Sequence, residues 1–343
     1  MDPTHVRRAQ RTRLDRRELD RALLPSTMFV TLQDRCGACD GPWGRVRTPN
    51  GMGSPMTQAT NPQASSLEGA GATGVSPLSS SEREALKRSY AEDGYFIVKN
   101  VVSREKLALL RTRIVEEFER TKRSGRLIHG GGGISGHLNS FPGEESRFAY
   151  EAVCERGIVD LVREIYPRPF VTPNVGCNLN LPDSVAQHYH VDSSYLDAFM
   201  VVNVAVVDTD VANGAIEVVP GTHKKFYKYW RFALERPQRF SKRLPMNQGD
   251  VLVRTSSLWH RGMPNRTALP RPMIALVFGQ GQSEVQRRDP FTVNEGKMMF
   301  YENWYRPTVL GRIRERTFVV APFTYSAYRF VRSLFGNKGY VTP

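Results

Sequence analysis

Gln187-His188-Tyr189-His190-Val191-Asp192 is the stretch from which the fold and the chemistry of this chain are best approached. We expect it to be an extended strand, in which alternate side chains point to the same face. His190 and Asp192 then lie on one face, about 6–7 Å apart along the backbone. His188 shares that face, so it competes with them as a ligand. The stretch therefore predicts most of a metal site carried on a single strand.

A third ligand is offered by His260, which stands in the sequence Trp259-His260-Arg261-Gly262. Two neutral imidazoles and one carboxylate occupy one face of an octahedron and leave three positions open, as in non-haem Fe(II) oxygenases. Arg271 follows eleven residues after His260, and a planar guanidinium suits a dicarboxylate such as 2-oxoglutarate. An isolated His-x-Asp pair arises by chance in many strands, but this spaced set of four residues predicts a pocket for iron and 2-oxoglutarate.

A more specific motif lies between the two halves of this set. It reads Asn213-Gly214-Ala215-Ile216-Glu217-Val218-Val219-Pro220-Gly221-Thr222-His223. With His190-x-Asp192 before it, and with His260 and then Arg271 after it, the motif resembles the phytanoyl-CoA dioxygenase family of Fe(II)/2-oxoglutarate oxygenases. The resemblance covers roughly residues 78–281.

The resemblance implies a mainly β protein with flanking helices, built on a double-stranded β-helix, which is a jelly-roll or cupin-like core. It implies that Fe(II) is held by His190, Asp192 and His260. It also implies that 2-oxoglutarate and O₂ are cosubstrates, with ascorbate as a candidate reductant. The expected reaction hydroxylates an unactivated C–H bond and releases succinate and CO₂.

The cosubstrate site is implied by the same resemblance. Arg271 is expected to bind the far carboxylate of 2-oxoglutarate, and Gln187 and Asn178 are expected to lie near it. The chain departs from the family at Gly262, where a small hydroxyl residue often stands two positions after the distal histidine. This departure leaves open which side chain helps Arg271 to bind 2-oxoglutarate.

The retained Asp192 favours hydroxylation or a variant such as desaturation, because related halogenases have a small residue there that makes room for chloride. Family members act on acyl-CoA, amino acids, antibiotics and other natural products. The basic charge of the chain favours a small anionic substrate, such as an acyl-CoA, a nucleotide-linked metabolite or a natural-product intermediate. The sequence does not choose among them.

Three other functions stay open. A cupin-type metalloenzyme that does not use 2-oxoglutarate would take His188, His190 and His260 as ligands, although the glutamate expected after the histidine pair is absent. A nucleic-acid demethylase of the same superfamily would suit the basic charge, but the 213–223 motif speaks against it and we expect no nucleic-acid partner. A non-catalytic jelly-roll binding module is disfavoured because all three ligands are present.

The chain has 343 residues, a net charge of +14 and four cysteines. We expect a single domain at 78–343, because β-rich barrels of over about 200 residues commonly form one unit. Residues 1–77 are rich in Arg and then in Gly, Pro and Ser, which predicts a disordered leader.

The cysteines form no disulfide framework and Fe(II) needs a reducing compartment, so we expect a cytoplasmic protein. We expect no transmembrane segment, because no apolar run reaches about 18 residues.

Two segments outside the motifs are basic and aromatic. The insert 224–243 has eight Lys or Arg against one acid, Glu235. It is either a solvated loop or a rim at the open end of the barrel that attracts an anionic substrate. The C-terminal segment 282–343 is expected to pack against the barrel, while a role in a substrate channel or peripheral contact with an anionic membrane stays open.

Local patterns predict the remaining elements. A capping box at Ser81-Glu82-Arg83-Glu84 is expected to open a helix that ends before Gly94. An apolar stripe at helical spacing predicts a second helix at 104–122, and helical periodicity predicts a third at 148–166. The glycine-rich segment 129–137 is a candidate lid. The expected strands are 95–98, 170–180, 187–193, 199–208, 215–219, 249–255 and 272–279.

Overall fold

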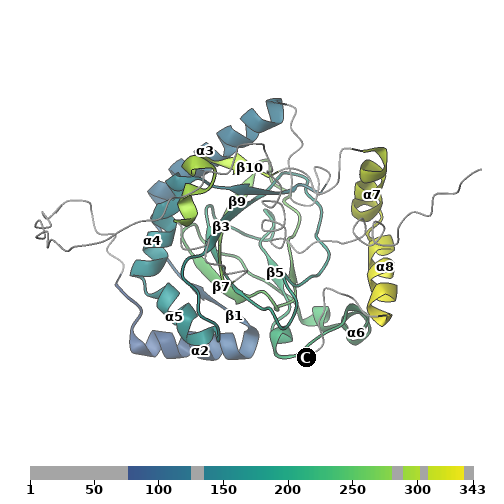
Figure 1. The fold of residues 1–343 in the computed structure, drawn as a ribbon, viewed down its shortest axis with the longest axis horizontal. Coiled ribbons are helices and arrows are strands. Elements are labelled where there is room, and N and C mark those ends of the chain that lie inside the picture. Colours follow the sequence, from purple (N-terminus) through teal and green to yellow (C-terminus); the bar gives the residue numbers. More distant parts are fainter. Residues whose placement is uncertain (1–75, 125–134, 280–288, 302–307, 336–343) are drawn as a thin grey trace, which may run out of the picture.

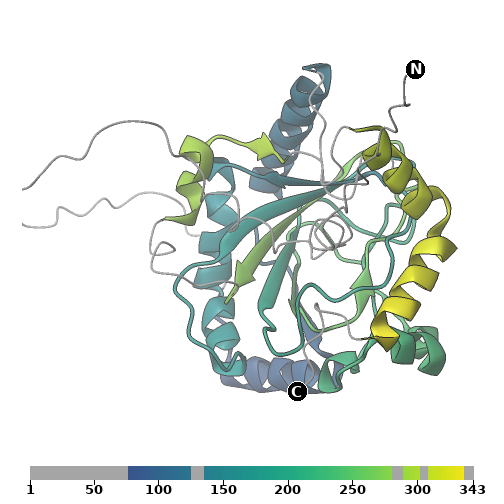
Figure 2. The same cartoon turned by 45° about the vertical axis from the view of Figure 1, so that its right-hand side comes forward.

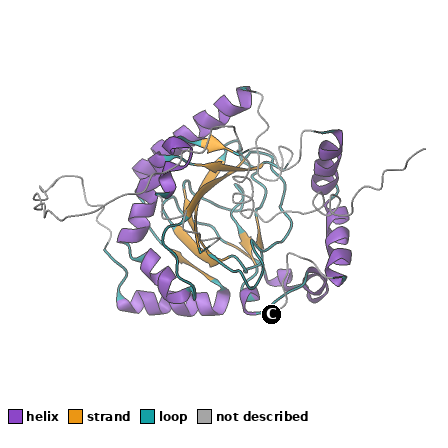
Figure 3. Cartoon of the chain, in the orientation of Figure 1, coloured by secondary structure: helices purple, strands orange, loops and turns teal. Residues whose placement is uncertain are grey.

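The computed structural model describes residues 76–124, 135–279, 289–301 and 308–335. The expected leader, apart from residues 76 and 77, and most of the glycine-rich segment 129–137 lie outside these residues. The described part is an antiparallel, sheet-rich core with flanking helices, as the sequence predicts (Figure 3).

The larger sheet has seven strands, and every pairing in it is antiparallel. Its strands, in spatial order, are β1 (Tyr95–Val98), β7 (Val251–Thr255), β4 (Met200–Ala205), β9 (Arg271–Phe278), β3 (Asn174–Asn180), β2 (His137–Phe141) and β10 (Met299–Phe300). The smaller sheet orders β6 (Lys242–Arg243), β5 (Glu217–Val218) and β8 (His260–Arg261). Strands of two residues carry no readable alternation, so the sequence could not predict β6, β8 and β10.

Four helices cover one face of the larger sheet (Figure 1). They are α2 (Ser80–Asp93), α3 (Arg104–Arg123), α4 (Arg147–Glu155) and α5 (Ile158–Ile165). The predicted stripe of α3 is confirmed, since its buried residues are Leu107, Leu110, Ile114 and Phe118. On the other side of the molecule lie α6 (Tyr229–Glu235), α7 (Val309–Val320) and α8 (Pro322–Leu334).

The first helix begins two residues earlier than expected. Its capping box joins Ser79 and Glu82, whereas we placed the box at Ser81 and Glu84. Both serines precede a glutamate by three positions, so the pattern alone cannot choose between them. Leu78 decides the matter, because its side chain is buried and its N–H donates to Arg156 O at 3.0 Å, which fixes where the chain enters the helix.

Two other expectations are wrong in detail. The helix expected at 148–166 is broken between α4 and α5, because Gly157 takes a left-handed φ of 77° and its N–H caps the first helix at Cys154 O. The strand expected at 187–193 is not a regular strand, and it makes one isolated bridge, between His190 and His260. The metal-ligand stretch thus pairs with β8 through this one bridge.

Alternation along the central strands separates an apolar face from a polar one. Residues such as Val202, Val253 and Leu276 join the core under the helices. Their strand neighbours point away from the helices. The polar residues on that inner face include His137, Asn139, Asn178, Asn180, Asn203, Arg254 and Arg271, and of these all but Asn178 are buried. This inner face looks toward the smaller sheet and the ligand stretch.

Candidate metal centre

His190 and His260 face each other across the isolated bridge. The N–H of His190 donates to His260 O at 2.9 Å, and the N–H of His260 donates to His190 O at 3.0 Å. The two imidazole rings lie 4.4 Å apart between centroids. A pair of backbone hydrogen bonds therefore brings together two histidines that are seventy positions apart in the chain.

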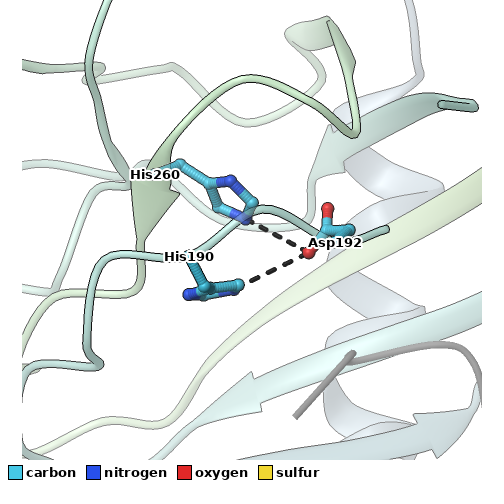
Figure 4. A group of neighbouring side chains, drawn as sticks. All are labelled: His190, Asp192 and His260. Atoms are coloured by element: carbon cyan, nitrogen blue, oxygen red, sulfur yellow. Dashed lines mark ion pairs between the residues drawn. The ribbon is translucent and has the colours of Figure 1, made fainter. Parts of the chain in front are cut away.

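Asp192 completes the group (Figure 4). Its N–H donates to Ser256 O at 2.9 Å, which fixes the backbone after the bridge. Its Oδ1 lies 3.6 Å from His190 Nε2 and 3.4 Å from His260 Nε2. One ligand atom from each residue lies within 4.8 Å of the others, and Asp192 and His260 are fully buried. The three residues expected to hold the metal therefore do converge.

Hydrogen bonds fix the tautomer of both histidines. Nδ1 of His190 contacts the carbonyl of His188 at 2.8 Å, and Nδ1 of His260 contacts the carbonyl of Leu258 at 2.8 Å. A carbonyl only accepts, so each Nδ1 carries the proton and each Nε2 presents a lone pair toward Asp192. This is how ligating histidines are usually oriented.

Two of the converging atoms are buried without a hydrogen-bond partner in the part of the chain that the structure describes. They are His190 Nε2 and Asp192 Oδ1. A buried acceptor left unpaired costs about 1–3 kcal/mol, so such atoms normally have a partner. A cation between two lone-pair nitrogens and one carboxylate oxygen would satisfy both atoms. The residues present therefore fit a divalent metal with two nitrogen ligands and one oxygen ligand.

Arg254 keeps the carboxylate of Asp192 ionised. The sequence analysis did not identify Arg254 as part of the site. Its Nη1 donates to Asp192 Oδ2 at 2.7 Å, and both side chains are buried. Burial would raise the pKa of Asp192, but the charge of Arg254 outweighs it and holds the pKa below its usual range. The carboxylate is thus ionised, with one oxygen engaged and the other free. An arginine within the apolar strand Val251–Thr255 was the available signal.

His190 is neutral at ordinary pH. Burial and then the neighbouring His260 lower the pKa of His190 to about 3. A metal ligand must be deprotonated before it can bind, so a neutral imidazole needs no proton release. The site is electrostatically prepared for a cation.

Arg271 is the first residue of β9 and lies on the inner face. It is buried, its Nη2 donates to Gly214 O at 3.3 Å, and its Nε has no partner. Burial lowers the pKa of Arg271 to about 10, which keeps it charged at pH 7. Gly214 has a φ of 86°, and a Cβ there would lie 2.5 Å from Asn180 Nδ2. The Asn-Gly turn of the sequence motif therefore packs directly against Asn180 of β3 and accepts a hydrogen bond from Arg271 of β9.

Gln187 holds the segment that carries Gly262. The N–H of Gln187 donates to Gly262 O at 2.9 Å, and the N–H of Gly262 donates to Gln187 Oε1 at 2.8 Å. A Cβ at position 262 would lie 2.7 Å from that Oε1 and 2.8 Å from His137 Cε1. The space that a small hydroxyl residue would take is therefore filled by Gln187 and His137.

His137 is a second residue that sequence reasoning missed. Its Nε2 donates to Val185 O at 2.8 Å, and it is buried. Burial and the nearby Arg271 lower the pKa of His137 to about 4, although the hydrogen bond to Val185 opposes this shift. The residue therefore stays neutral beside the arginine.

Asn178 lies on the inner face of β3, opposite Met273 of β9. The next inner position along the ladder pairs Asn180 with Arg271. The Asn178 amide contacts Leu138 O and Asn139 Oδ1, each at 3.3 Å. Its expected place near the cosubstrate stays a prediction.

His188 does not join the group, although it was expected to share the face of His190. Its Nε2 contacts Phe318 O at 3.3 Å, and its ring meets Tyr325 edge-on at 4.6 Å between centroids. The stretch is not a regular strand, so strict alternation fails there.

The C-terminal helices hold the ligand stretch from outside. Arg329 of α8 is buried, and its Nη1 donates to Tyr189 O at 2.6 Å. Its guanidinium lies 4.0 Å from the centroid of the Tyr229 ring. The described part of the C-terminal segment thus packs on the core, as expected, and reaches the residue next to His190.

The basic insert lies behind the ligands. Phe232 of α6 stacks on Trp259 at 3.9 Å between ring centroids, in a small core with Val191 and Val219. Trp259 and Val191 belong to that core, whereas their neighbours His260 and Asp192 belong to the metal-ligand group. Tyr227, Tyr229 and Phe232 of the insert thus serve packing, and the attraction of an anionic substrate by the insert stays a prediction.

The family model described as Phytanoyl-CoA dioxygenase (PhyH) matches residues 90–273. Solved structures are also similar to the chain. The epimerase SnoN in complex with Fe³⁺, alpha ketoglutarate and nogalamycin RO is 21% identical, over 58% of this chain and 84% of that chain, with a TM-score of 0.46. AviO1 from Streptomyces viridochromogenes Tue57 is 17% identical, over 60% of this chain and 98% of that chain, with a TM-score of 0.47. HygX from Streptomyces hygroscopicus with nickel, 2-oxoglutarate and hygromycin B bound is 13% identical, over 57% of this chain and 87% of that chain, with a TM-score of 0.45.

Proposed function

Because the chain belongs to the phytanoyl-CoA dioxygenase family, we propose that it is an Fe(II)/2-oxoglutarate-dependent dioxygenase. The observation that carries this proposal is the buried convergence of His190 Nε2 and Asp192 Oδ1, both without partners, with His260 Nε2. His190, Asp192 and His260 are assigned as the iron ligands. The larger antiparallel sheet and the smaller one, which carries His260 in β8, are interpreted as a double-stranded β-helix.

Ferrous iron on two histidines and one carboxylate supplies the oxidation of a C–H bond, coupled to conversion of 2-oxoglutarate and O₂ into succinate and CO₂. The residues of the chain hold the iron and orient the ligand atoms toward it. Arg254 keeps Asp192 ionised and presents one oxygen, while the two Nδ1 hydrogen bonds aim the Nε2 lone pairs. Ascorbate is assigned as the external reductant.

Arg271 is proposed to bind the far carboxylate of 2-oxoglutarate. Its support is a buried guanidinium whose Nε has no partner among the described residues, on the inner face of the larger sheet. A buried charge without a counter-ion is costly, and an incoming carboxylate would compensate it. Gln187 and Asn178 are proposed to lie beside the same ligand, with Gln187 also fixing the Gly262 segment.

The reaction is proposed to be hydroxylation of a small anionic metabolite. Asp192 supports hydroxylation, because its carboxylate takes the place that chloride would need. The excess of 48 Lys and Arg over 34 Asp and Glu supports an anionic substrate, such as an acyl-CoA, a nucleotide-linked compound or a natural-product intermediate. A reducing compartment suits ferrous iron, so we place the enzyme in the cytoplasm.

Two rival functions make different predictions. A cupin-type enzyme would need His188 as a ligand, yet its Nε2 is held by Phe318 O. A nucleic-acid demethylase would bind DNA with an affinity that falls steeply with salt.

The test is a substrate screen with the full chain, Fe(II), 2-oxoglutarate and ascorbate. We expect succinate formation that one class among CoA thioesters, nucleotide sugars and free acids stimulates. Asp192→Ala should abolish it, whereas Asp197→Ala, an exposed residue of the same loop, should leave it unchanged. No decarboxylation of 2-oxoglutarate by the iron-loaded wild type, with or without any of these compounds, would overturn the proposal.

A further inference from the structure

The helices α7 and α8 follow each other along one edge of the molecule (Figure 2). Their inner side is buried at residues spaced by four, which include Gly311, Glu315, Tyr325, Arg329 and Ser333. Their outer side carries the apolar residues Val309, Ile313, Val320, Phe323, Val331 and Leu334, all exposed. The exposed fraction reaches 72% at Phe323. Helical spacing places these side chains together on the outer side of each helix, and we call the six residues the apolar stripe.

Exposed apolar side chains concentrate in this part of the molecule. Among the described residues, sixteen large apolar side chains are exposed, and eight of them lie in 308–335. Two more, Leu234 and Phe240, lie in or beside α6. The elements adjoin, since the N–H of Trp230 donates to Ser333 Oγ at 2.9 Å. Isolated exposed apolar residues are ordinary, but a cluster of this kind marks an interaction surface.

Positive charge concentrates in the same elements. Residues 224–243 have eight Lys or Arg and one acid, and residues 308–335 have five Arg and one acid. These two short segments therefore carry an excess of eleven positive charges, compared with +14 for the whole chain. Arg312 and Arg316 are exposed on α7 beside the apolar stripe.

We propose that the outer face of α7 and α8, together with the adjoining segment 224–243, docks on an anionic lipid bilayer. The apolar stripe enters the interface, and the flanking Arg and Lys side chains pair with lipid phosphates. The contact is peripheral, because no helix in the described ranges is long and apolar enough to cross a bilayer.

Charge complementarity, together with the apolar stripe, favours an anionic bilayer over a second copy of the chain and over a nucleic acid. A second copy of the chain would bring two strongly positive faces together, which costs electrostatic energy. A nucleic acid would pair with the arginines but would leave the apolar stripe in water. The inner side of the same helices holds the ligand stretch through Arg329, so docking on the outer side leaves those contacts in place.

The test is co-sedimentation of the full chain with vesicles, without iron or cosubstrate, so that its outcome is independent of the enzymatic proposal. We expect binding to vesicles of phosphatidylcholine mixed with phosphatidylglycerol, and at least ten-fold weaker binding to phosphatidylcholine alone. Each arginine near such a surface contributes roughly a five-fold change in affinity. Arg312→Glu with Arg316→Glu should therefore lower binding by roughly twenty-five-fold or more.

The apolar contribution is tested by Phe323→Ser with Val331→Ser on α8 and, independently, by Val309→Ser with Ile313→Ser on α7. Each pair should lower binding on the order of ten-fold or more, because it removes two side chains that enter the interface. The matched control is Leu109→Ser with Val211→Ser, two exposed apolar residues outside these elements. This control should bind as the wild type does.

Three outcomes would overturn the proposal. The first is no sedimentation with anionic vesicles. The second is binding that the serine pairs leave unchanged, which would show adsorption by charge alone. The third is a lipid-free dimer that the Phe323→Ser and Val331→Ser pair dissociates, which would assign the stripe to a second copy of the chain.

Discussion

Arg254 and Arg271 are buried on the same face of the larger sheet, but they have different partners. Arg254 is paired with Asp192, so its charge is already compensated. Among the described residues, Arg271 donates through Nη2 to a neutral carbonyl, Gly214 O, and its Nε has no partner. Of these two arginines, Arg271 is therefore the one suited to an incoming carboxylate, while Arg254 prepares the metal ligand.

Arg254→Met should destabilise the protein strongly. Removing one partner of a buried ion pair leaves an uncompensated charge and typically costs about 3–5 kcal/mol. A divalent metal such as Co²⁺ should recover part of this loss, because it replaces the missing positive charge. Urea unfolding with and without metal measures both effects. The control is Arg113→Met, whose exposed ion pair with Glu116 should contribute less than about 1 kcal/mol.

Arg271→Ala should weaken 2-oxoglutarate binding by about 1.5–3 kcal/mol, the usual contribution of a charged hydrogen bond. The measurement is an anaerobic titration of the Fe(II) protein with 2-oxoglutarate. Arg266→Ala, an exposed arginine five positions earlier, is the control. An unchanged affinity in Arg271→Ala would refute the assignment, provided that the variant keeps its metal content.

At the scale of elements, the site depends on segments that are barely regular. The ligand stretch is held by a single bridge to a two-residue strand, β8. Its geometry is reinforced on one side by the reciprocal contacts of Gln187 with Gly262, and on the other by Arg329 of α8. Each reinforcement can be removed separately.

Gly262→Ser should destabilise the protein by about 1–3 kcal/mol, the usual effect of overpacking. The new side chain would meet Gln187 Oε1 and His137 Cε1 at less than 3 Å. Adding Gln187→Ala should recover part of the loss, because it empties the space. Urea midpoints of the two single variants and the double variant test this, and strictly additive effects would contradict it.

Arg329→Ala should lower metal affinity although Arg329 is not a ligand. Its hydrogen bond to Tyr189 O fixes the residue before His190, and losing a charged hydrogen bond costs about 1.5–3 kcal/mol. Metal titration followed by the spectrum of bound Co²⁺ should show weaker binding with the same ligand set. Arg316→Ala, exposed on α7, should change nothing. A wild-type metal affinity in Arg329→Ala would rule out this positioning role.

At the scale of the whole molecule, folding buries histidines that must stay neutral. Burial lowers the pKa of His137 to about 4, and burial with His260 lowers that of His190 to about 3. The unfolded chain, with histidine pKa values near 6.5, therefore binds more protons below pH 6.5.

The metal-free protein should accordingly lose stability as the pH falls from 6.5 toward 4. Each histidine contributes at most about 1.4 kcal/mol per pH unit in this window, and its contribution is complete above pH 6.5. Unfolding in urea between pH 7.5 and pH 5 measures the slope. His137→Gln keeps a donor for Val185 O but cannot titrate, so its slope should be shallower. Equal slopes would show that His137 does not titrate on unfolding.

Residue type and spacing were enough to predict the family and the three residues that converge. His190-x-Asp192, the 213–223 motif and His260 lie within short stretches, so each can be recognised without knowing the fold. The same holds for the helical stripe of α3 and for the sheet-rich core, because both depend on local periodicity.

What only the tertiary structure decided is which distant side chains complete the site. Arg254 reaches Asp192 across 62 positions and Arg329 reaches Tyr189 across 140, and no local pattern encodes such pairs. Folding also turned His188 toward Phe318 and placed His137 beside Gly262. The physical reason is that a side chain's partners in a buried site are set by packing between segments, whereas periodicity reports only the face of its own segment.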